Sequence, residues 1–442
     1  MRPYRTRCGA LFLIAAPVLF APAARAQGPA TSPGPDSDRL TLNEVYALAA
    51  ERNPRIAAAA AVADASAASV PSAGLPPDPV FQIGAMNLSL PELDADMPSS
   101  MAPSVQLMQM IPFPGKLGFS ERIASRTSDM ARSDAGETEW MIRADVGMAF
   151  YDLYAADRQI EVMAKTLRLL EDFERVARAM YGAGLGRQSD VLSANVEIAR
   201  MEADIARMKA MRKVAAARLN GLLDWPAETP VPSPVLPELP ATVPAQDTLR
   251  SWAEETRPML EKVKTGVERA DARVALARRE LWPDFTVGLQ YGQRDLGMGT
   301  ERMGGAMVGF SIPIFAAGRQ LKMRDEATAM RRMATADLAD MRASVDAEIG
   351  ALLAELERAR TLIDLYETTV IPQAEANVES SFSSYRVGSV DFMTLVDAQM
   401  TLNQYEQENY ELLAAYGTAV SRLEAAVGRE LPPTIEVLAE VR

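Results

Sequence analysis

Long stretches of this chain repeat their apolar residues at intervals of three or four, which predicts helices of unusual length. No proline occurs between Pro114 and Pro226, and a helical pattern fills Lys116 to Met180 and then resumes as far as about Leu222. A helix of about 65 residues is about 97 Å long, whereas helices of globular proteins average about 12 residues. We therefore expect a long helical hairpin with coiled-coil packing.

Glycine interrupts two such long helical patterns, each time three residues after a tyrosine. The pairs are Tyr181 with Gly184 and Tyr385 with Gly388, and the helical pattern resumes directly after each. Because glycine reaches positive φ at low cost, it can end one helix in a tight turn. Residues 181–186 and 385–390 are therefore predicted to be the tips of two helical hairpins.

The two tips belong to a longer internal repeat, since Tyr181 and Tyr385 lie 204 residues apart. The same offset separates four earlier pairs: Pro54 and Pro258, Pro79 and Pro283, Phe81 and Phe285, and Gly84 and Gly288. Repeats of this kind indicate one structural unit used twice. We expect one unit at 41–225, a proline-rich linker at 226–246, a second unit at 247–429, and a C-terminal tail at 430–442.

Segments that alternate apolar with polar or small residues precede each long helical hairpin. They lie at 80–90 and 104–112 in the first unit, and at 284–292 and 305–313 in the second. Strands of about 9–11 residues can cross a bilayer at a tilt. An amphipathic hairpin on a soluble core would show the same period.

A further helix is expected before each strand pair. The first runs from Thr41 to about Val70, where Thr41 and Glu44 form a capping box and Pro71 then breaks the helix. The second covers 249–281. Pro372 is expected to kink the long helix of the second unit, and the return helix covers 390–428.

The N-terminus has the pattern of a secretory signal at 1–26, with cleavage after Ala26 and a flexible leader at 27–40. Cleavage removes the only cysteine, Cys8, and four arginines, so the net charge of −13 becomes more negative by four. The new N-terminus has no cysteine for a lipid anchor, and an acidic chain binds nucleic acid poorly. No later stretch approaches about 20 continuous apolar residues, so no transmembrane helix is expected. The chain could then be soluble and periplasmic, secreted, or an outer-membrane β-barrel.

Four strands cannot close a membrane barrel, because the smallest bacterial barrels have about eight. An open sheet in lipid leaves unsatisfied edge groups. If these strands lie in a membrane, the protein must therefore be an oligomer, and three chains would supply 12 strands.

The order of elements resembles the TolC-like outer-membrane efflux family over nearly the whole mature chain. So do the strand-to-helix junctions, Pro112-Phe113-Pro114-Gly115-Lys116 and Ile312-Pro313-Ile314-Phe315 with Gly318-Arg319. The first junction looks most like the heavy-metal (CusC/CzcC-like) branch. The resemblance implies a mostly α fold with a membrane β-barrel, in which a homotrimer forms a 12-strand β-barrel and a 12-helix α-barrel.

The same resemblance implies a passive, gated duct and not an enzyme. It would lie in outer-membrane lipid with its α-barrel in the periplasm, conduct heavy-metal cations, and meet a periplasmic adaptor and an inner-membrane pump of the RND type. No cofactor is implied, and the absence of histidine and of mature cysteine argues against nucleophile–base catalysis and a tight zinc site.

Site residues follow from the positions that match the family's motifs. Adaptor contact is expected at the tips: Tyr181, Gly182, Gly184, Leu185, Gly186, Tyr385, Val387, Gly388, Ser389 and Val390. The gate is expected to use a polar link of Asp190 with Tyr385 and an acidic ring at Asp397. Thr394 stands where a second ring acid would be, and Val390 where a latch arginine would be, so Asp391 or Arg386 could serve instead.

Methionines cluster around the predicted strands, at Met86, Met97, Met101, Met108 and Met110. Their thioethers suit soft cations such as Cu(I) or Ag(I), although methionine also fills irregular apolar gaps. Two broader alternatives stay open. One is a duct of the same kind for drug efflux or type I protein secretion, and the other is a periplasmic coiled-coil adaptor or structural protein.

Overall fold

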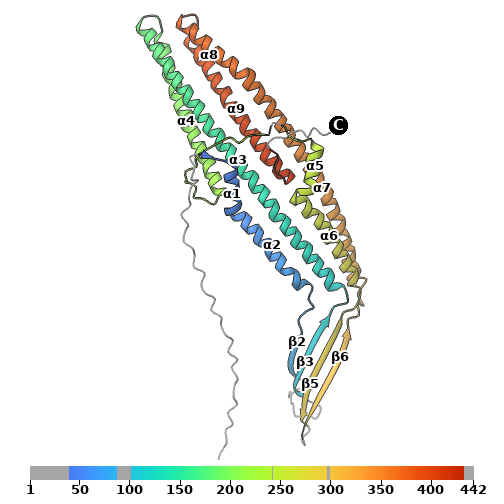
Figure 1. The fold of residues 1–442 in the computed structure, drawn as a ribbon. Coiled ribbons are helices and arrows are strands. Elements are labelled where there is room, and N and C mark those ends of the chain that lie inside the picture. Colours follow the sequence, from blue (N-terminus) through green and yellow to red (C-terminus); the bar gives the residue numbers. More distant parts are fainter. Residues whose placement is uncertain (1–38, 87–100, 241, 296–298, 433–442) are drawn as a thin grey trace, which may run out of the picture.

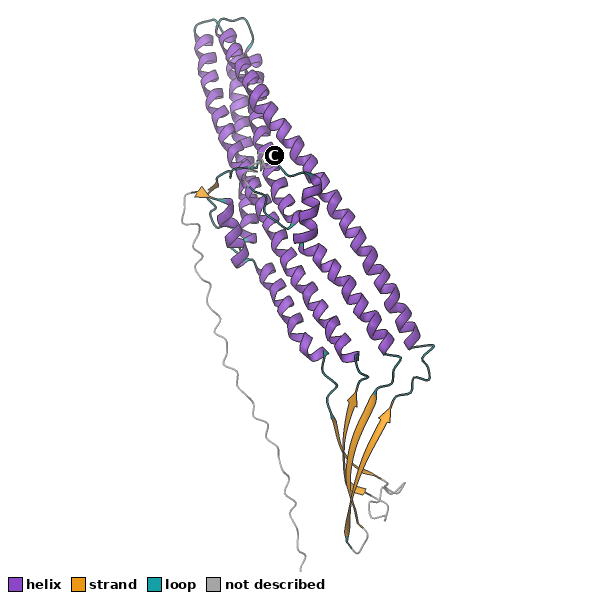
Figure 2. Cartoon of the chain, turned by 45° about the vertical axis from the view of Figure 1, so that its right-hand side comes forward, coloured by secondary structure: helices purple, strands orange, loops and turns teal. Residues whose placement is uncertain are grey.

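The described part of the chain, residues 39–86, 101–240, 242–295 and 299–432, forms one elongated body in this computed structural model (Figure 1). Long helices run side by side to two loops at one end, and four strands lie at the opposite end (Figures 1 and 2). The fold is therefore mostly helical, with its sheet confined to one end.

The same order of elements occurs in each half of the chain. The first half contains α1 (Leu42–Arg52), α2 (Pro54–Ala73), β2 (Val80–Met86), β3 (Met101–Ile111), α3 (Lys116–Gly182) and α4 (Gln188–Leu222). The second half contains α5 (Gln246–Thr256), α6 (Pro258–Arg279), β5 (Phe285–Asp295), β6 (Thr300–Phe310), α7 (Gln320–Leu365), the π-helical turn η1 (Tyr366–Val370), α8 (Ile371–Arg386) and α9 (Phe392–Val427).

The helix expected before each strand pair is in fact two helices, so the prediction of one continuous helix was wrong. The break falls at Asn53 and at Arg257, whose ψ angles of 120° and 117° are extended. Each precedes a proline, which disfavours the α conformation in the residue before it and then starts the next helix at its first position. Pro71 was expected to end the first helix, but it lies inside α2, which continues to Ala73.

The predicted capping box at the start of α1 is confirmed. The Glu44 amide donates to Thr41 Oγ1 at 3.4 Å, and the Thr41 amide donates to the Glu44 carboxylate at 3.0 Å. The cap fixes the point at which the chain enters the body.

The long helix of the second half is interrupted one turn before Pro372, by the π-helical turn η1. A proline ring clashes with the carbonyl four residues earlier in a regular α-helix, which here belongs to Thr368 inside η1. The wider π turn makes room for that ring, so the expected kink takes the form of a π-bulge.

The four strands form one antiparallel sheet in the order β2-β3-β5-β6, in which β3 and β5 join the two halves. The strand bounds differ from those expected. In particular β3 begins at Met101 rather than 104, and β6 covers Thr300–Phe310 rather than 305–313. Glycines 304 and 305 do not stop β6, because each pairs with a residue of β5. The outer strands β2 and β6 each leave one edge without a partner in the described chain.

The last residues of the leader are ordered, contrary to the expectation of a flexible leader, and they pair with the linker. Arg39–Leu40 (β1) pairs in parallel with Ser233–Pro234 (β4), and Leu40 is fully buried. Trp225 and Val231 are buried with Leu40 in the same apolar cluster. The leader's last residues and the linker therefore cover the middle of the helical body.

Three buried clusters hold the helices together along the body. One joins α1, α3 and α4 to the linker, a second joins α5, α7 and α9, and the third joins both helical hairpins near their tips. Close approach of α3 and α9 depends on Gly417, since a Cβ there would lie 2.3 Å from the Tyr151 ring.

Among the described residues, α2 alone is long and apolar enough to cross a membrane by length and composition. Its mean hydropathy of 1.3 comes largely from alanine, and none of its residues is buried.

Candidate functional site

The two hairpin tips have the same backbone. Gly184 and Gly388 take φ angles of 73° and 74°, in the left-handed region. In the first tip the Leu185 amide donates to the Met180 carbonyl at 2.9 Å, and in the second the Ser389 amide donates to the Ser384 carbonyl at 3.0 Å. Both turns thus close through a bond that spans five residues around a left-handed glycine, as in a Schellman motif.

A pocket lies between the two tips and is lined by both. The first tip contributes Met180, Leu185, Gly186, Arg187 and Asp190, and the second contributes Tyr385, Gly388, Ser389, Val390 and Asp391. The structure therefore brings together most of the residues that were expected at the tips, from segments about 200 residues apart.

The link between Tyr385 and Asp190 joins the two hairpins. The Tyr385 hydroxyl donates to Asp190 Oδ2 at 3.4 Å, and the tyrosine side chain is only 3% exposed. Its ring meets Phe392 edge-on at 5.5 Å between centroids. Burial, followed by the neighbouring Asp190 carboxylate, raises the pKa of Tyr385 to about 12. The phenol is therefore neutral at physiological pH and can donate to the carboxylate.

Asp391 and Thr394 form the N-terminal cap of α9. The Asp391 carboxylate accepts from the Thr394 amide at 2.9 Å and from the Thr394 hydroxyl at 2.7 Å. These two bonds hold the pKa of Asp391 below its usual value. Within a single chain, the side chains of Asp391 and Thr394 therefore bond to each other and cap the N-terminus of α9.

Arg386 is exposed in the last turn of α8, with its guanidinium carbon 6.0 Å from the Phe382 ring centroid. It makes no ion pair with any residue that the structure describes. Tyr181, Leu185 and Val387 are the large exposed side chains of the tips, at 48%, 77% and 79%.

Asp397 is exposed at one end of a groove along α9, about one and a half turns from the start of that helix. Gln404, Glu408 and Glu411 line the same groove, and their spacing puts them on one face of the helix. The sequence analysis missed Glu408 and Glu411, although their spacing from Asp397 was a readable signal.

Hydrogen bonds from other helices fix these two glutamates. Tyr366, in the π-helical turn, donates to Glu408, and this bond is the main reason why the pKa of Tyr366 rises to about 12. Gln159 of α3 donates to Glu411 at 2.7 Å. The groove is therefore an ordered acidic row.

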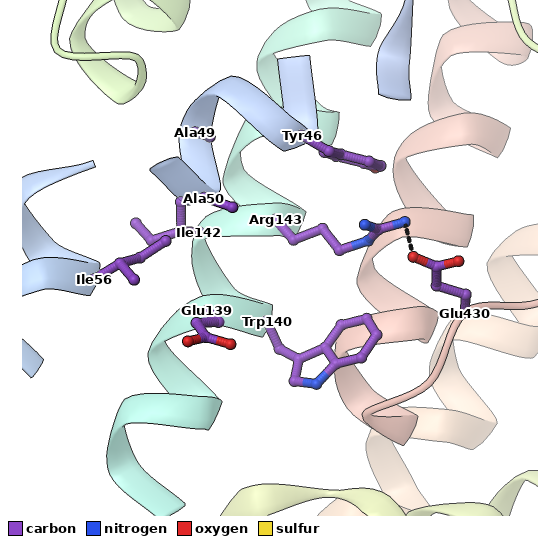
Figure 3. Close-up of a pocket in the computed structure, with 9 residues that line it drawn as sticks. All are labelled: Tyr46, Ala49, Ala50, Ile56, Glu139, Trp140, Ile142, Arg143 and Glu430. Atoms are coloured by element: carbon purple, nitrogen blue, oxygen red, sulfur yellow. Dashed lines mark ion pairs between the residues drawn. The ribbon is translucent and has the colours of Figure 1, made fainter. Parts of the chain in front are cut away.

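A second pocket, near the middle of the body, contains none of the expected site residues (Figure 3). Arg143 lies there 3.9 Å from the Tyr46 ring centroid and pairs with Glu430 at 2.8 Å. Leu431 is also buried. The segment expected to be a tail from residue 430 thus begins as part of the packed body. The pocket lies where this segment packs against α1 and α3.

The five methionines of the suggested soft-metal cluster do not converge on one point. Met97 lies outside the described residues. Met86 and Met101 are paired in the register of β2 and β3, whereas Met108 and Met110 lie further along β3. No group of three or more His, Cys, Asp or Glu that could hold a metal is found in the described segments.

Comparisons with known proteins bear on the whole chain. A sequence profile of the family described as "Outer membrane efflux protein" matches residues 45–223 and 249–429. The cobalt-zinc-cadmium resistance protein CzcC of Cupriavidus metallidurans is 25% identical over 406 residues, which cover 88% of this chain and 90% of that protein.

Solved structures share the fold at lower identity. A crystal structure of CusC has a TM-score of 0.76 at 16% identity, covering 90% of this chain and 95% of its own. The outer membrane protein VceC of Vibrio cholerae has a TM-score of 0.74 at 17% identity, covering 88% and 97%.

Proposed function

The chain belongs to the outer membrane efflux protein family, and we propose that it forms the outer-membrane duct of a tripartite system that exports heavy-metal cations. The alignment with a cobalt-zinc-cadmium resistance protein over nearly the full length of both chains carries this proposal. The resemblance to the TolC-like family predicted from the sequence is confirmed.

The duct is a homotrimer. The four-stranded sheet leaves the edges of β2 and β6 without partners in the described chain, and open edges are not tolerated in lipid. Pairing β6 of one copy with β2 of the next removes every edge and gives a barrel of 12 strands from three copies. Four helices per chain, α2, α3, α6 and α7, lie next to the strands, so the same symmetry gives a ring of 12 helices.

The barrel lies in the outer membrane and the helical body in the periplasm. We propose that residues 1–26 are a signal peptide removed after Ala26 and that the mature chain is not lipidated at its N-terminus. Neither a cofactor nor a nucleic acid takes part in this function.

The tips meet a periplasmic adaptor and, through it, an RND-type pump. Exposed apolar side chains at both tips, Leu185 and Val387, support this contact. Leu185→Asp and Val387→Asp should each abolish cross-linking to the adaptor in cells, whereas Met211→Asp on α4, also exposed, should not. Equal loss of cross-linking in all three variants would contradict contact at the tips.

The gate lies close behind the tips. We propose that the link of Tyr385 with Asp190 holds the two hairpins of one chain in register. Asp397, repeated by three-fold symmetry, forms a cation-attracting constriction, and Glu408 and Glu411 extend its negative potential along the lumen. Asp397→Asn should reduce block of the channel by divalent cations without loss of the trimer.

The test of the function is deletion of the gene, followed by challenge with cobalt, zinc, cadmium, copper, silver and hydrophobic drugs. Metal sensitivity restored by the wild-type gene is the expected result. Sensitivity to drugs alone, or loss of a secreted protein, would instead assign the duct to drug efflux or type I secretion. A water-soluble monomer without conductance in planar bilayers would favour the periplasmic coiled-coil alternative.

A further inference from the structure

The two faces of the sheet differ in their apolar residues. The strand register puts Phe, Val, Leu, Ile and Tyr on one face: Phe81, Ile83, Val105, Leu107, Ile111, Phe285, Val287, Leu289, Tyr291, Val308 and Phe310. The opposite face carries Gln, Ser, Thr and Gly, the paired positions Arg294 and Glu301 near the far end of β5 and β6, and four methionines: Met108, Met110, Met303 and Met307. Apart from Val80 at the end of β2, methionine is the only large apolar residue on this second face of the described strands.

Two of these methionines meet over one glycine. Met108 of β3 and Met307 of β6 are both in register with Gly288 of β5, which lies between them. A Cβ on Gly288 would lie 2.6 Å from Met307 Cγ, 3.1 Å from Met307 Sδ and 3.5 Å from Met108 Cγ. Both side chains thus lean over the space that glycine leaves free, from the two strands on either side of β5.

The residues next to the two thioethers suit a soft cation. The Gln106 side-chain amide lies 3.5 Å from Met307 Sδ, and Met110 follows Met108 by two residues on the same face. The chain has no histidine, and the carboxylate that the register places on the described part of this face, that of Glu301, lies six residues from Met307 along β6. Thioether sulfur is a ligand for Cu(I) and Ag(I).

Gap filling does not account for this distribution. A methionine that fills an irregular core is buried, whereas Met307 is 40% exposed and Met110 45% exposed. Filling would also place methionine on both faces, yet the described apolar face uses branched and aromatic residues instead. Because the glycine floor leaves these thioethers open, an ion passing over the face can reach them.

We propose that Met108 and Met307 form a thioether site for a soft monovalent cation, Cu(I) or Ag(I), on the inner face of the barrel. The site rests on the proposed function, because that function makes this face of the sheet the lining of the lumen. The class of substrate that it implies is a soft monovalent metal cation, which would bind there transiently during export. Thioethers carry no proton at neutral pH, so binding releases none. Affinity should therefore be the same from pH 5 to pH 8, unlike that of a carboxylate or imidazole site.

The experiment uses the full-length protein purified in detergent, with silver nitrate in chloride-free buffer as the probe. Titration calorimetry should show silver binding that weakens at least tenfold in Met108→Leu/Met307→Leu. Leucine keeps the apolar volume and removes only the sulfur. The matched control is Met323→Leu/Met330→Leu on α7, whose methionines are similarly exposed and should leave the affinity unchanged.

A spectroscopic readout locates the ion. With methyl-labelled methionine, silver should shift two resonances, and Met108→Leu and Met307→Leu should each remove one of them. Unchanged silver affinity in the double variant, or shifts confined to other methionines, would overturn the site.

Failure of the proposed function would look different, because wild type and both double variants would then all lack conductance in planar bilayers.

A second variant, Gly288→Ala, retains both thioethers but pushes Met307 aside, and should also weaken silver binding. Full silver affinity in that variant would contradict the geometry argued here.

Discussion

The two tips share a backbone but use their equivalent side chains in opposite ways. Tyr181 and Tyr385 occupy the same position before the left-handed glycine, yet the first is 48% exposed and the second 3% exposed. Tyr385 packs on Phe392 and bonds to the other hairpin through Asp190. At the position equivalent to Phe392 the first tip has Gln188, which offers no ring to pack against.

The residues that start the return helices have diverged in the same way. Asp391 caps α9 with its carboxylate, whereas Arg187, its counterpart 204 residues earlier, makes no side-chain cap to α4. Glycine therefore sets the turn in both tips, and the side chains around it decide which tip is packed inward. The tyrosine of the second tip forms the joint between the hairpins, whereas the tyrosine of the first tip stays exposed.

The largest expected effect comes from truncating the tyrosine on each side of the comparison. Tyr385→Ala removes a buried ring and should lower the free energy of unfolding by about 3 kcal/mol. Tyr181→Ala removes an exposed ring and should stay within about 0.5 kcal/mol. Thermal unfolding of the purified protein followed by circular dichroism measures both. Similar losses in the two variants would mean that the tips are equivalent after all.

Alanine at the two left-handed glycines tests the backbone conformation that the two tips share. Gly184→Ala and Gly388→Ala should each cost about 1–2 kcal/mol, because a Cβ strains a left-handed residue, even though neither site has a neighbouring atom within 4 Å. The control is Gly182→Ala at the end of α3, where φ is not positive and alanine should be neutral or stabilising. A different loss of unfolding free energy in Gly184→Ala and in Gly388→Ala would show that the two turns do not impose the same backbone strain.

Removing only the hydroxyl isolates the bond between the hairpins. Tyr385→Phe should lower the free energy of unfolding by about 0.5–1.5 kcal/mol at pH 7, and it should increase single-channel conductance if the link restrains the gate. Tyr181→Phe should change neither quantity.

The difference in stability between wild type and Tyr385→Phe should depend on pH, because the pKa of Tyr385 is raised from the ordinary 10 to about 12. Below pH 10 the phenol is neutral in both the folded and the unfolded chain, so its contribution to stability is fully present. Between pH 10 and pH 12 the unfolded chain ionises first, and the contribution is lost. The stability difference between wild type and Tyr385→Phe should therefore shrink over this range, and a constant difference would argue against the buried hydroxyl.

Features that depend on the local backbone could be predicted from the sequence, whereas features that depend on packing between distant segments could not. Glycine and proline act locally, so the repeat offset located both tips and the linker before any contact was known. The breaks before Pro54 and Pro258 are equally local, because a proline disfavours the α conformation in the residue before it, so these two prolines were a readable signal for them. The burial of Tyr385 was not predictable from its repeat position, because it depends on contacts with residues of two other helices. Leu40 and Leu431 illustrate the same limit, since each packs against segments distant in sequence.

The smallest expected effect comes from exchanging the helix starts. Arg187→Asp gives α4 the side-chain cap that α9 already has and should stabilise the protein by about 0.5 kcal/mol. Asp391→Ala should destabilise it, with a characteristic pH dependence. Because the folded-state pKa of Asp391 is lowered, its contribution is present above the ordinary carboxyl pKa and disappears as the pH falls below it. Urea unfolding of both variants at pH 7 and in mild acid measures these shifts. If Arg187→Asp failed to stabilise at either pH, Arg187 would have another use at the first tip, such as its attraction to Asp391 across the pocket.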